Sequence, residues 1–381
     1  MTTTDKLIRL ITAKRDMREA LKEKGVETWG GLNIYPEAVD RIGEDMPIEV
    51  ISSDVLFCED GTRLRFYGSV PQIDVSKMTS MERMFYDNGV YNVYEGGDIQ
   101  YVFREFEIDD VFTVNSLSWT FAQCLGLERV SIGKAEYVNN INGTFAGCKN
   151  LKYVYLPLSK VDDSKYTFQR CTSLINVDLG DFECDITDGM FLQCTSLQNT
   201  VPYVGKVSSS EMYKGCTSII DIPSLNIDRV HLISTFENCT NLKSISNIIG
   251  QPKAFGRLYP AENSWIGGCS NIESIDEIDC SKCESLDCIF GNPGMGDEKY
   301  NLVNVGGFKD YGKLSYAYSL SLRMAPNLSK QSLLNILNLL FDLKQNGEKT
   351  LRISMTSNQL EKLQSSDIKI ATDKGWILRQ I

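Results

Sequence analysis

The stretch FAGCKNLKYVYL, residues 145–156, contains the motif that organises this chain of 381 residues. In it an aromatic residue is followed by a cysteine three positions later and by a leucine six positions later. The same spacing recurs in FAQCLGL at 121–127, FQRCTSL at 168–174, FLQCTSL at 191–197, YKGCTSI at 213–219, FENCTNL at 236–242 and IGGCSNI at 266–272. The seven cysteines of these copies follow one another at intervals of 24, 23, 23, 22, 23 and 30 residues.

This period predicts the fold. A fixed repeat of about 20 to 29 residues with leucine at constant offsets is typical of a leucine-rich-repeat solenoid. After the leucine the apolar residues alternate, as in Leu151, Val154 and Leu156, which predicts a short strand with one buried face. No single coil can bury its own apolar residues, so the coils are expected to stack around a continuous core. The stacked strands then form a parallel sheet with a spacing of about 4.8 Å.

The repeats divide the chain into three parts. We expect an N-terminal helical segment at 1–45, a solenoid with inserted loops at 46–310 and an α/β cap at 311–381. The predicted fold class is therefore α/β, a leucine-rich-repeat solenoid of about 23-residue repeats with a helical segment before it and a cap after it. An open solenoid needs a cap because its last coil otherwise exposes apolar core and an unpaired strand edge.

The N-terminal segment carries apolar residues at helical spacing, and a second short helix follows it. The residues expected to anchor or oligomerise the chain are Leu7, Leu10, Ile11, Met17, Leu21, Leu32 and Tyr35. Two short amphipathic helices are too small to hold a core of their own. They are expected to pack on the solenoid, on a second copy of the chain or on a partner.

The C-terminal part alternates helical and extended patterns. Residues 327–347 read as a helix, with Ser329 as N-cap and Gly347 as its end. A strand at 350–354, helical stretches at 357–363 and 367–374, and a final strand from Trp376 complete the predicted cap.

Three segments lengthen the repeats, at 86–97, 251–263 and 291–299. Loops inserted into a solenoid lie on its surface and often form its binding face. Simple variation of a tolerant surface explains them equally well. Tyr91 and Tyr94 in the first insertion, and Tyr101 shortly after it, are candidate contact residues because tyrosine is favoured at interfaces, and packing against the solenoid is the alternative for their rings.

The chain holds 12 cysteines and one histidine. Free cysteine is a small and often buried hydrophobic residue, so the motif cysteines are expected to line the core. Cys280, Cys283 and Cys288, with Cys269 before them, leave a zinc site as the alternative. The spacing after the first Cys-x-x-Cys pair does not fit a second pair, and the sequence therefore predicts no metal.

Composition excludes several functions. The chain has 50 acidic and 39 basic residues and a net charge of −11, which argues against a nucleic-acid partner. No apolar run reaches the roughly 18 residues of a membrane span, so no membrane insertion is expected. With His231 alone for acid–base chemistry, we expect no enzyme, no catalytic residue and no cofactor. A carboxylate pair of the glycosidase kind stays open, although no pair stands out.

The pattern F-x-x-C-x-(S/N)-L-x-x-(V/I)-x-L over residues 74–290 resembles the BspA-like class of leucine-rich repeats, named for a bacterial surface antigen. That resemblance implies adhesion and binding of proteins or glycans rather than catalysis.

Both ends resemble phage proteins. ITAKRDMREALKEKGV at 11–26 is similar to a helical motif of tailed-phage virion proteins. SLLNILNLLFDL at 332–343 and IATDKGWIL at 370–378 are similar to the cap of repeat proteins in phages and prophages of gut bacteria. The N-terminus also lacks the apolar core of a signal peptide.

These resemblances imply a virion protein made in the host cytoplasm, a tail-fibre or other appendage component. Its expected partners are other virion proteins, itself, or a host-surface protein or glycan. The alternative is a bacterial surface or secreted adhesin, which would be exported.

Overall fold

The computed structural model describes residues 79–87, 104–109, 111–201, 207–255, 264–286, 289–290, 301–315, 317–347 and 350–381, together with four short strands at 48–49, 73–74, 90–91 and 100–101. The chain divides into two compact units, each described by itself. Unit 1 comprises the described residues up to 159 and residues 178–181, and unit 2 comprises 160–177 and 182–381. Both units are stacks of one repeated coil, so the predicted solenoid is confirmed.

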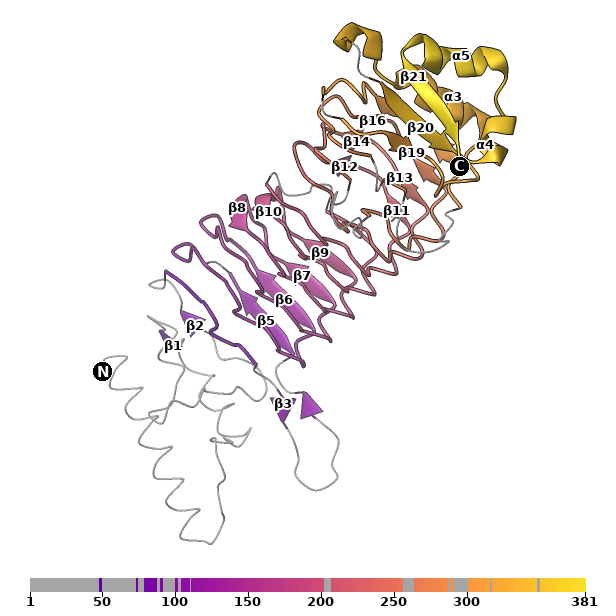
Figure 1. Ribbon diagram of the computed structural model, residues 1–381. Coiled ribbons are helices and arrows are strands. Elements are labelled where there is room, and N and C mark those ends of the chain that lie inside the picture. The colour runs from indigo at the N-terminus through magenta and orange to yellow at the C-terminus, as the bar shows by residue number, and fades with distance from the viewer. Residues whose placement is uncertain are drawn as a thin grey trace, which may run out of the picture. The chain divides into compact units, whose positions relative to one another are not determined.

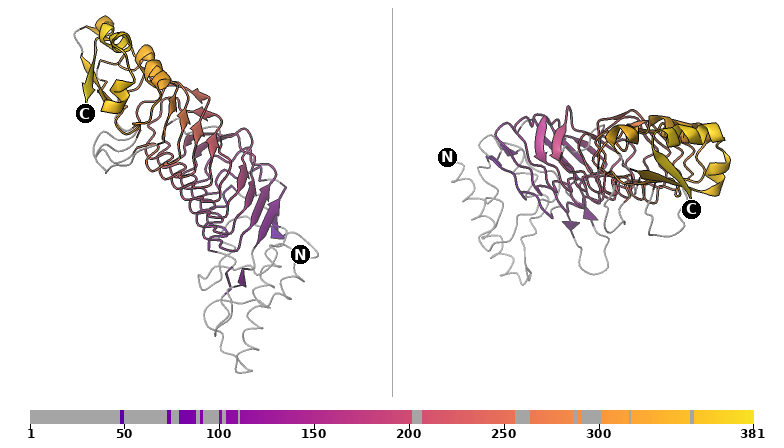
Figure 2. Two further views of the ribbon diagram at one scale, coloured as in Figure 1. Left: turned by 90° about the vertical axis from the view of Figure 1, so that its right-hand side faces the viewer. Right: turned by 45° about the horizontal axis from the view of Figure 1, so that its top comes forward.

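The strands of unit 1 form a parallel sheet across the stack. Strands β5 (Glu105–Ile108), β6 (Arg129–Ile132) and β7 (Tyr153–Tyr155) pair in register and lie side by side (Figures 1 and 2). The register places Phe106 beside Val130 and Val130 beside Val154, and all three side chains are buried. Nearer the N-terminus, β1 (Ile48–Glu49) pairs in parallel with β2 (Ile73–Asp74), and β3 (Val90–Tyr91) pairs antiparallel with β4 (Gln100–Tyr101).

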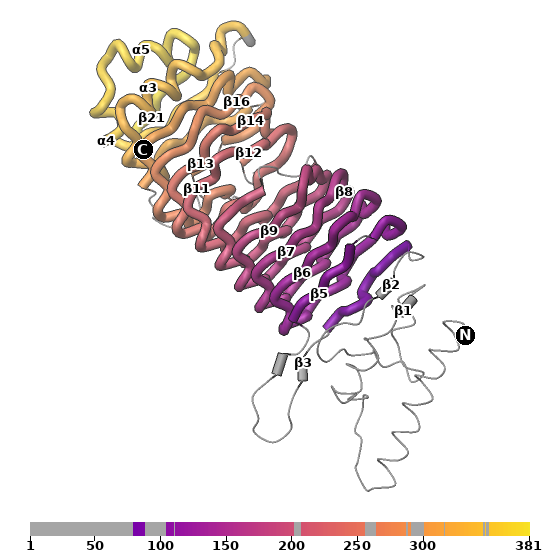
Figure 3. The backbone as a smooth tube through the Cα atoms, turned by 180° about the vertical axis from the view of Figure 1, so that it is seen from behind, coloured from indigo at the N-terminus to yellow at the C-terminus, as the bar shows by residue number. Residues whose placement is uncertain are grey.

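Unit 2 repeats this pairing with shorter strands, seen from behind in Figure 3. Its strands before the cap are β8 (Lys160–Asp163), β9 (Asn176–Asp178, whose last residue belongs to unit 1), β10 (Glu183–Ile186), β11 (Asp221–Ile222), β12 (Leu225–Asn226), β13 (Ser244–Ile245), β14 (Ile248–Ile249), β15 (Ser274–Ile275), β16 (Ile278–Asp279), β17 (Asn304–Val305) and β18 (Phe308–Lys309). Parallel sheets run in the orders β11-β13-β15-β17, β12-β14, β16-β18 and β10-β8. Each pair joins equivalent strands of two coils, as the repeat predicts.

The aromatic residues of the motif stack in the core. In unit 1 the ring of Phe121 lies between Phe85 and Phe145, at centroid distances of 5.3 and 5.4 Å and within 8° of parallel. In unit 2 the stack is Phe168, Phe191, Tyr213 and Phe236, with centroid distances of 5.2 to 5.4 Å. Trp265 ends it edge-on, at 71° to Phe236. The insertion before Trp265 coincides with this break.

The motif cysteines form a second ladder beside the rings. Six motif thiols donate to the backbone carbonyl oxygen of the aromatic residue one coil earlier, as Cys148 does to Phe121 at 2.9 Å. The other bonds, at 2.9 to 3.1 Å, are Cys124 to Phe85, Cys194 to Phe168, Cys216 to Phe191, Cys239 to Tyr213 and Cys269 to Phe236. All seven motif cysteines are buried and unoxidised, which confirms the predicted core ladder. Burial raises the pKa of the thiols of Cys148, Cys194, Cys216 and Cys269 and keeps them protonated donors.

The backbone around each aromatic residue turns through left-handed conformations. Two residues before and two after Phe121, Trp119 and Gln123 have φ of 55° and 62°. The backbone N–H groups of Trp119, Phe121 and Gln123 donate to carbonyl oxygens of the next coil, at 2.7 to 2.9 Å. Because these bonds all point the same way along the stack, every coil depends on its neighbour for the partners of its backbone.

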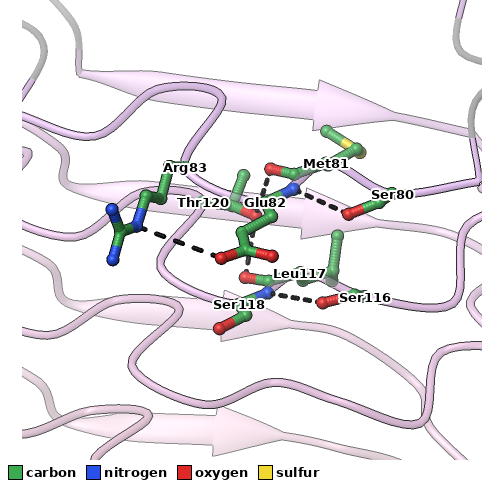
Figure 4. A network of polar contacts seen from close by, with 8 residues as sticks. All are labelled: Ser80, Met81, Glu82, Arg83, Ser116, Leu117, Ser118 and Thr120. Carbon is green, nitrogen blue, oxygen red and sulfur yellow. Dashed lines mark hydrogen bonds and ion pairs between the residues drawn. The ribbon is translucent and has the colours of Figure 1, made fainter. Parts of the chain in front are cut away.

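Side chains complete these turns, as Figure 4 shows for two coils of unit 1. The Ser80 hydroxyl accepts the N–H of Glu82 at 3.2 Å, and the Ser116 hydroxyl accepts that of Ser118 at 3.3 Å. The buried Thr120 hydroxyl lies 2.8 Å from the carbonyl oxygen of Met81, in the preceding coil. Short polar side chains thus hold the turn where the backbone leaves the strand.

The cap follows the predicted order, with one correction. It contains β19 (Leu320–Ser321), α3 (Lys330–Leu339), the 3₁₀ helix η2 (Leu343–Asn346), β20 (Leu351–Met355), α4 (Ser357–Glu361), α5 (Ser365–Asp373) and β21 (Trp376–Gln380). The three strands form a parallel sheet in the order β19-β20-β21. Ser329 caps α3, as predicted, by accepting the N–H of Ser332 at 3.1 Å.

The predicted helix at 327–347 is wrong in its second half. Leu340 is extended, with ψ of 143°, and the Phe341 N–H donates to the carbonyl oxygen of Tyr311 at 3.0 Å. The ammonium of Lys374 binds the carbonyl oxygens of Leu337 and Leu340, at 3.2 and 2.9 Å, and so satisfies the end of α3. Gly347 ends η2 instead. The predicted N-terminal helices lie outside the described residues, and so do Leu7, Leu10, Ile11, Met17, Leu21, Leu32 and Tyr35.

Gly143 offers a test of the turn geometry. Its φ is 61°, and a Cβ added there would lie 2.7 Å from the Trp119 ring. Gly143→Ala should lower the free energy of unfolding by about 1–2 kcal/mol for the left-handed backbone and by a further 1–3 kcal/mol or so for the clash. Denaturant unfolding measures the total loss of unfolding free energy, and amide exchange measures the loss of protection in the surrounding coils.

Gly215 provides the matched control. Its φ is 77°, but an added Cβ would meet nothing nearer than 3.5 Å, so Gly215→Ala should show only the backbone cost. Trp119→Ala combined with Gly143→Ala should remove the clash. Equal losses of unfolding free energy in Gly143→Ala and Gly215→Ala would contradict the steric explanation.

Candidate interaction surface

The outer face of the unit 1 sheet carries five exposed side chains in two rows. Buried residues alternate with exposed ones along β5, β6 and β7, as the strand period requires. One row is Glu105, Arg129 and Tyr153, and the other is Glu107, Ser131 and Tyr155. Tyr153 and Tyr155 are 50% and 44% exposed, so that much of each ring, and not the hydroxyl alone, is open to solvent. We call these six residues the strand face.

The charged and aromatic groups of the strand face have no partners within the described part of the chain. None of Glu105, Glu107, Arg129, Tyr153 and Tyr155 forms a side-chain hydrogen bond or ion pair there. The backbone beneath them is hydrogen-bonded in the parallel sheet, with β6 paired on both sides. The strand face is therefore a rigid platform whose polar groups are left to a ligand or to water.

Where the strands begin, the charges are instead paired. Glu128 lies between Lys152, at 2.8 Å, and Arg104, at 3.7 Å. The hydrogen bond from Lys152 lowers the pKa of the Glu128 carboxyl against the opposing effect of burial. These three residues come from three successive coils, so they join the coils at the border of the strand face and contribute little to binding.

The composition of the strand face fits recognition. Tyrosine and arginine are enriched at protein interfaces, where they bury large flat surfaces and still offer hydrogen bonds. In the described ranges no three His, Cys, Asp or Glu side chains are placed to hold a metal ion. Nor is any helix in them long and apolar enough to cross a bilayer.

The structure places only part of the predicted site. Tyr91 lies on β3 and Tyr101 on β4, and the hairpin pairs Val90 with Tyr101. Tyr94 lies outside the described residues. The sequence analysis missed Tyr153 and Tyr155, although the signal was present: in the stretch YVY the buried Val154 fixes both neighbours on the outer face.

The remaining cysteines and the histidine are not part of a site in the described structure. Cys280 and Cys283 are free and buried, and the Cys283 thiol donates to the carbonyl oxygen of Ser285 at 3.2 Å. Burial raises the pKa of Cys280. Cys288 lies outside the described residues. His231 is exposed, and partial burial of its ring together with nearby Lys253 lowers its pKa.

Comparison with known proteins supports the repeat type. Residues 117–243 match the family model described as the BspA type leucine rich repeat region, in six copies. One similar solved structure is a leucine-rich repeat protein from Bacteroides ovatus ATCC 8483, at 14% identity over 77% of this chain and 90% of that one, with a TM-score of 0.24. No curated protein matches the chain. The central repeats are thus of the BspA type.

Lys152→Met tests the paired border. The pKa of Glu128 should rise, since its strongest hydrogen-bond donor is lost. A carboxyl whose pKa is lowered in the folded state stabilises the fold above its unfolded pKa of about 4.3, and this stabilisation is lost as the pH falls through the folded pKa. The variant should therefore lose less stability than the parent between about pH 5 and pH 3.

An NMR titration of the Glu128 carboxyl and thermal unfolding against pH measure these effects. Lys134→Met, which removes a charge whose Nζ lies 5.1 Å from the centroid of the Phe112 ring, should leave the pKa of Glu128 unchanged. An unchanged pKa in the Lys152 variant would show that the contact is not maintained in solution.

Proposed function

We propose that the chain is a protein-binding repeat protein whose partner docks on the strand face of unit 1. The observation that carries this proposal is the pair Tyr153 and Tyr155, exposed on one strand, with the unpartnered Arg129 beside Tyr153 on the neighbouring strand. BspA-type repeats at 117–243 support a binding role of this kind.

The energetics of docking favour these two rings. Both rings project from a hydrogen-bonded sheet. Binding of a partner therefore requires little ordering of this surface beyond the two tyrosine side chains. Burial of apolar surface contributes about 25 cal/mol per Å², and aromatic residues at the centre of an interface often contribute most of its energy. Arg129 and Glu105 lie in the same row, one strand apart, and make the face selective for a partner of complementary charge.

Tyr153→Ala with Tyr155→Ala tests the proposal. We expect binding to weaken at least tenfold, or about 1.4 kcal/mol, while the fold is kept because both rings are on the surface. Proteins captured from the native cell by the parent and by the variant are identified by mass spectrometry, and dissociation constants are then measured with the purified captured protein.

Tyr137→Ala is the matched control. This tyrosine is 65% exposed but follows β6 in a turn, away from the strands. Its loss should leave the dissociation constant unchanged. Equal affinity of parent and double variant for the captured protein would refute docking on the strand face.

We further propose that the protein is a tailed-phage virion component, in a tail fibre or another appendage, made in the host cytoplasm and carried on the particle. Support comes from the motif at 11–26 and from the cap sequences at 332–343 and 370–378, which resemble phage proteins. In this role residues 1–45 anchor the chain to other virion proteins or to a second copy, and the strand face contacts a host-surface protein or glycan.

The virion proposal is tested on purified particles. Mass spectrometry of gradient-purified virions should detect the protein, and deletion of residues 1–45 should abolish its incorporation while circular dichroism still shows the solenoid. Normal incorporation of the truncated protein would refute the anchoring role.

A bacterial surface or secreted adhesin is the second candidate, and the BspA-type match favours it. An adhesin and a virion component differ in where the protein is found. Fractionation of the native cell should then find the protein on the surface or in the medium, with no association with particles. Open reading frames for portal, capsid or tail proteins beside the gene would decide for the virion.

A further inference from the structure

The sheet of the cap has one buried and one exposed face. Leu351, Ile353 and Met355 of β20 are buried, and so is Trp376 of β21, whose indole N–H donates to the carbonyl oxygen of Phe341 at 2.9 Å. The residues between them point to the other side. The exposed face consists of Ser321, Arg352, Ser354, Ile377 and Arg379, which we call the arginine face.

The strands set the spacing of the two arginines. Arg352 pairs in register with Ile377, and Ser354 pairs with Arg379. The arginines therefore lie on neighbouring strands, one strand spacing across and two residues along, or about 8 Å apart at their Cα atoms. Ile377 is 47% exposed and adjoins both arginines, directly opposite Arg352 and two residues before Arg379. Partly exposed hydroxyls of Ser321 and Ser354 continue the face onto β19.

The charge of the arginine face is not balanced within the cap sheet. Arg352 and Arg379 form no side-chain hydrogen bond or ion pair in the described part of the chain. Strands β19, β20 and β21 contain no aspartate or glutamate. The whole chain, in contrast, has an excess of 11 acidic over basic residues. Two guanidinium groups on neighbouring strands give this face a local positive charge, which favours an anionic partner.

The shape and composition of the face select among anions. Nucleic-acid surfaces use extended clusters of basic residues, whereas this face offers two arginines beside an exposed isoleucine. In an extended peptide, side chains two residues apart point the same way at about 6.7 Å, close to the separation of the two arginines.

We propose that the arginine face docks an extended acidic segment of a partner protein, with carboxylates at alternate positions bound by Arg352 and Arg379. Arginine suits this task because its planar guanidinium binds a carboxylate through two parallel hydrogen bonds. This surface is distinct from the strand face and does not depend on it.

Fluorescence anisotropy with the full chain tests the proposal. The probe is a labelled ten-residue peptide that alternates glutamate and valine, and its comparison peptide has glutamine in place of glutamate. We expect the glutamate peptide to bind at least tenfold more tightly than the glutamine peptide in 50 mM salt. Arg352→Glu with Arg379→Glu should reduce binding at least tenfold.

Lys344→Glu with Lys369→Glu is the matched control. Both lysines are exposed, in η2 and α5 of the same cap, and the double substitution changes the net charge by the same amount. It should keep the affinity for the glutamate peptide. Arg352→Lys with Arg379→Lys should retain part of the affinity, because the charge stays while the two-pronged hydrogen bonding is lost.

Several results would overturn the proposal. These are absence of binding by the parent, equal binding of the two peptides, and equal weakening by the lysine and arginine reversals. Tighter binding of a ten-nucleotide single strand would assign the face to nucleic acid. A salt-sensitive dimer in sedimentation that the arginine reversal abolishes would assign it to a second copy of the chain.

Discussion

The stack depends on contacts between neighbouring coils, in which the backbone N–H groups and six motif cysteines donate to backbone carbonyl oxygens of an adjacent coil. A coil of about 23 residues cannot satisfy its own buried backbone, and the Phe121 carbonyl, for example, accepts the Cys148 thiol at 2.9 Å. The same coil stacks its ring at 5.4 Å on that of Phe145. Thiol and ring are fixed three residues apart, so both contacts form only when the neighbouring coil keeps the same path. The period of the sequence is the consequence of that requirement.

A stack held in this way determines what the outer surface can do. Because every coil repeats the path of the one before, equivalent outward residues form straight rows across the sheet, as Glu105, Arg129 and Tyr153 do. The rows lie on paired backbone and cannot shift relative to one another without breaking the ladder beneath. A partner therefore meets a preformed pattern, and little of its binding energy is spent on ordering the surface.

The sequence was sufficient to predict the features that the repeat controls. It was not sufficient to predict the features that depend on a single contact between coils. Buried cysteines, stacked coils and the order of the cap elements follow from spacing and from helix signals such as Ser329. The break after Leu339 could not be predicted, because it depends on a bond from Phe341 to Tyr311 and on the ammonium of Lys374, both distant in sequence. The position of Gly143 under the Trp119 ring could likewise not be predicted, because the contact exists only once two coils have stacked. The candidate tyrosines were sought in an insertion, whereas the exposed pair lies within the repeat.

Core and surface of this protein therefore carry different information. At the buried strand position three coils have Phe106, Val130 and Val154, all apolar, while the neighbouring outward position has an acid, a base and a tyrosine. Packing constrains the first set and leaves the second free to vary. A family match at 117–243 reports the constrained positions, since these define the repeat. In the proposed binding role recognition resides in the unconstrained positions, which makes Tyr153, Tyr155 and the arginines of the cap better guides to the proposed partners than the motif itself.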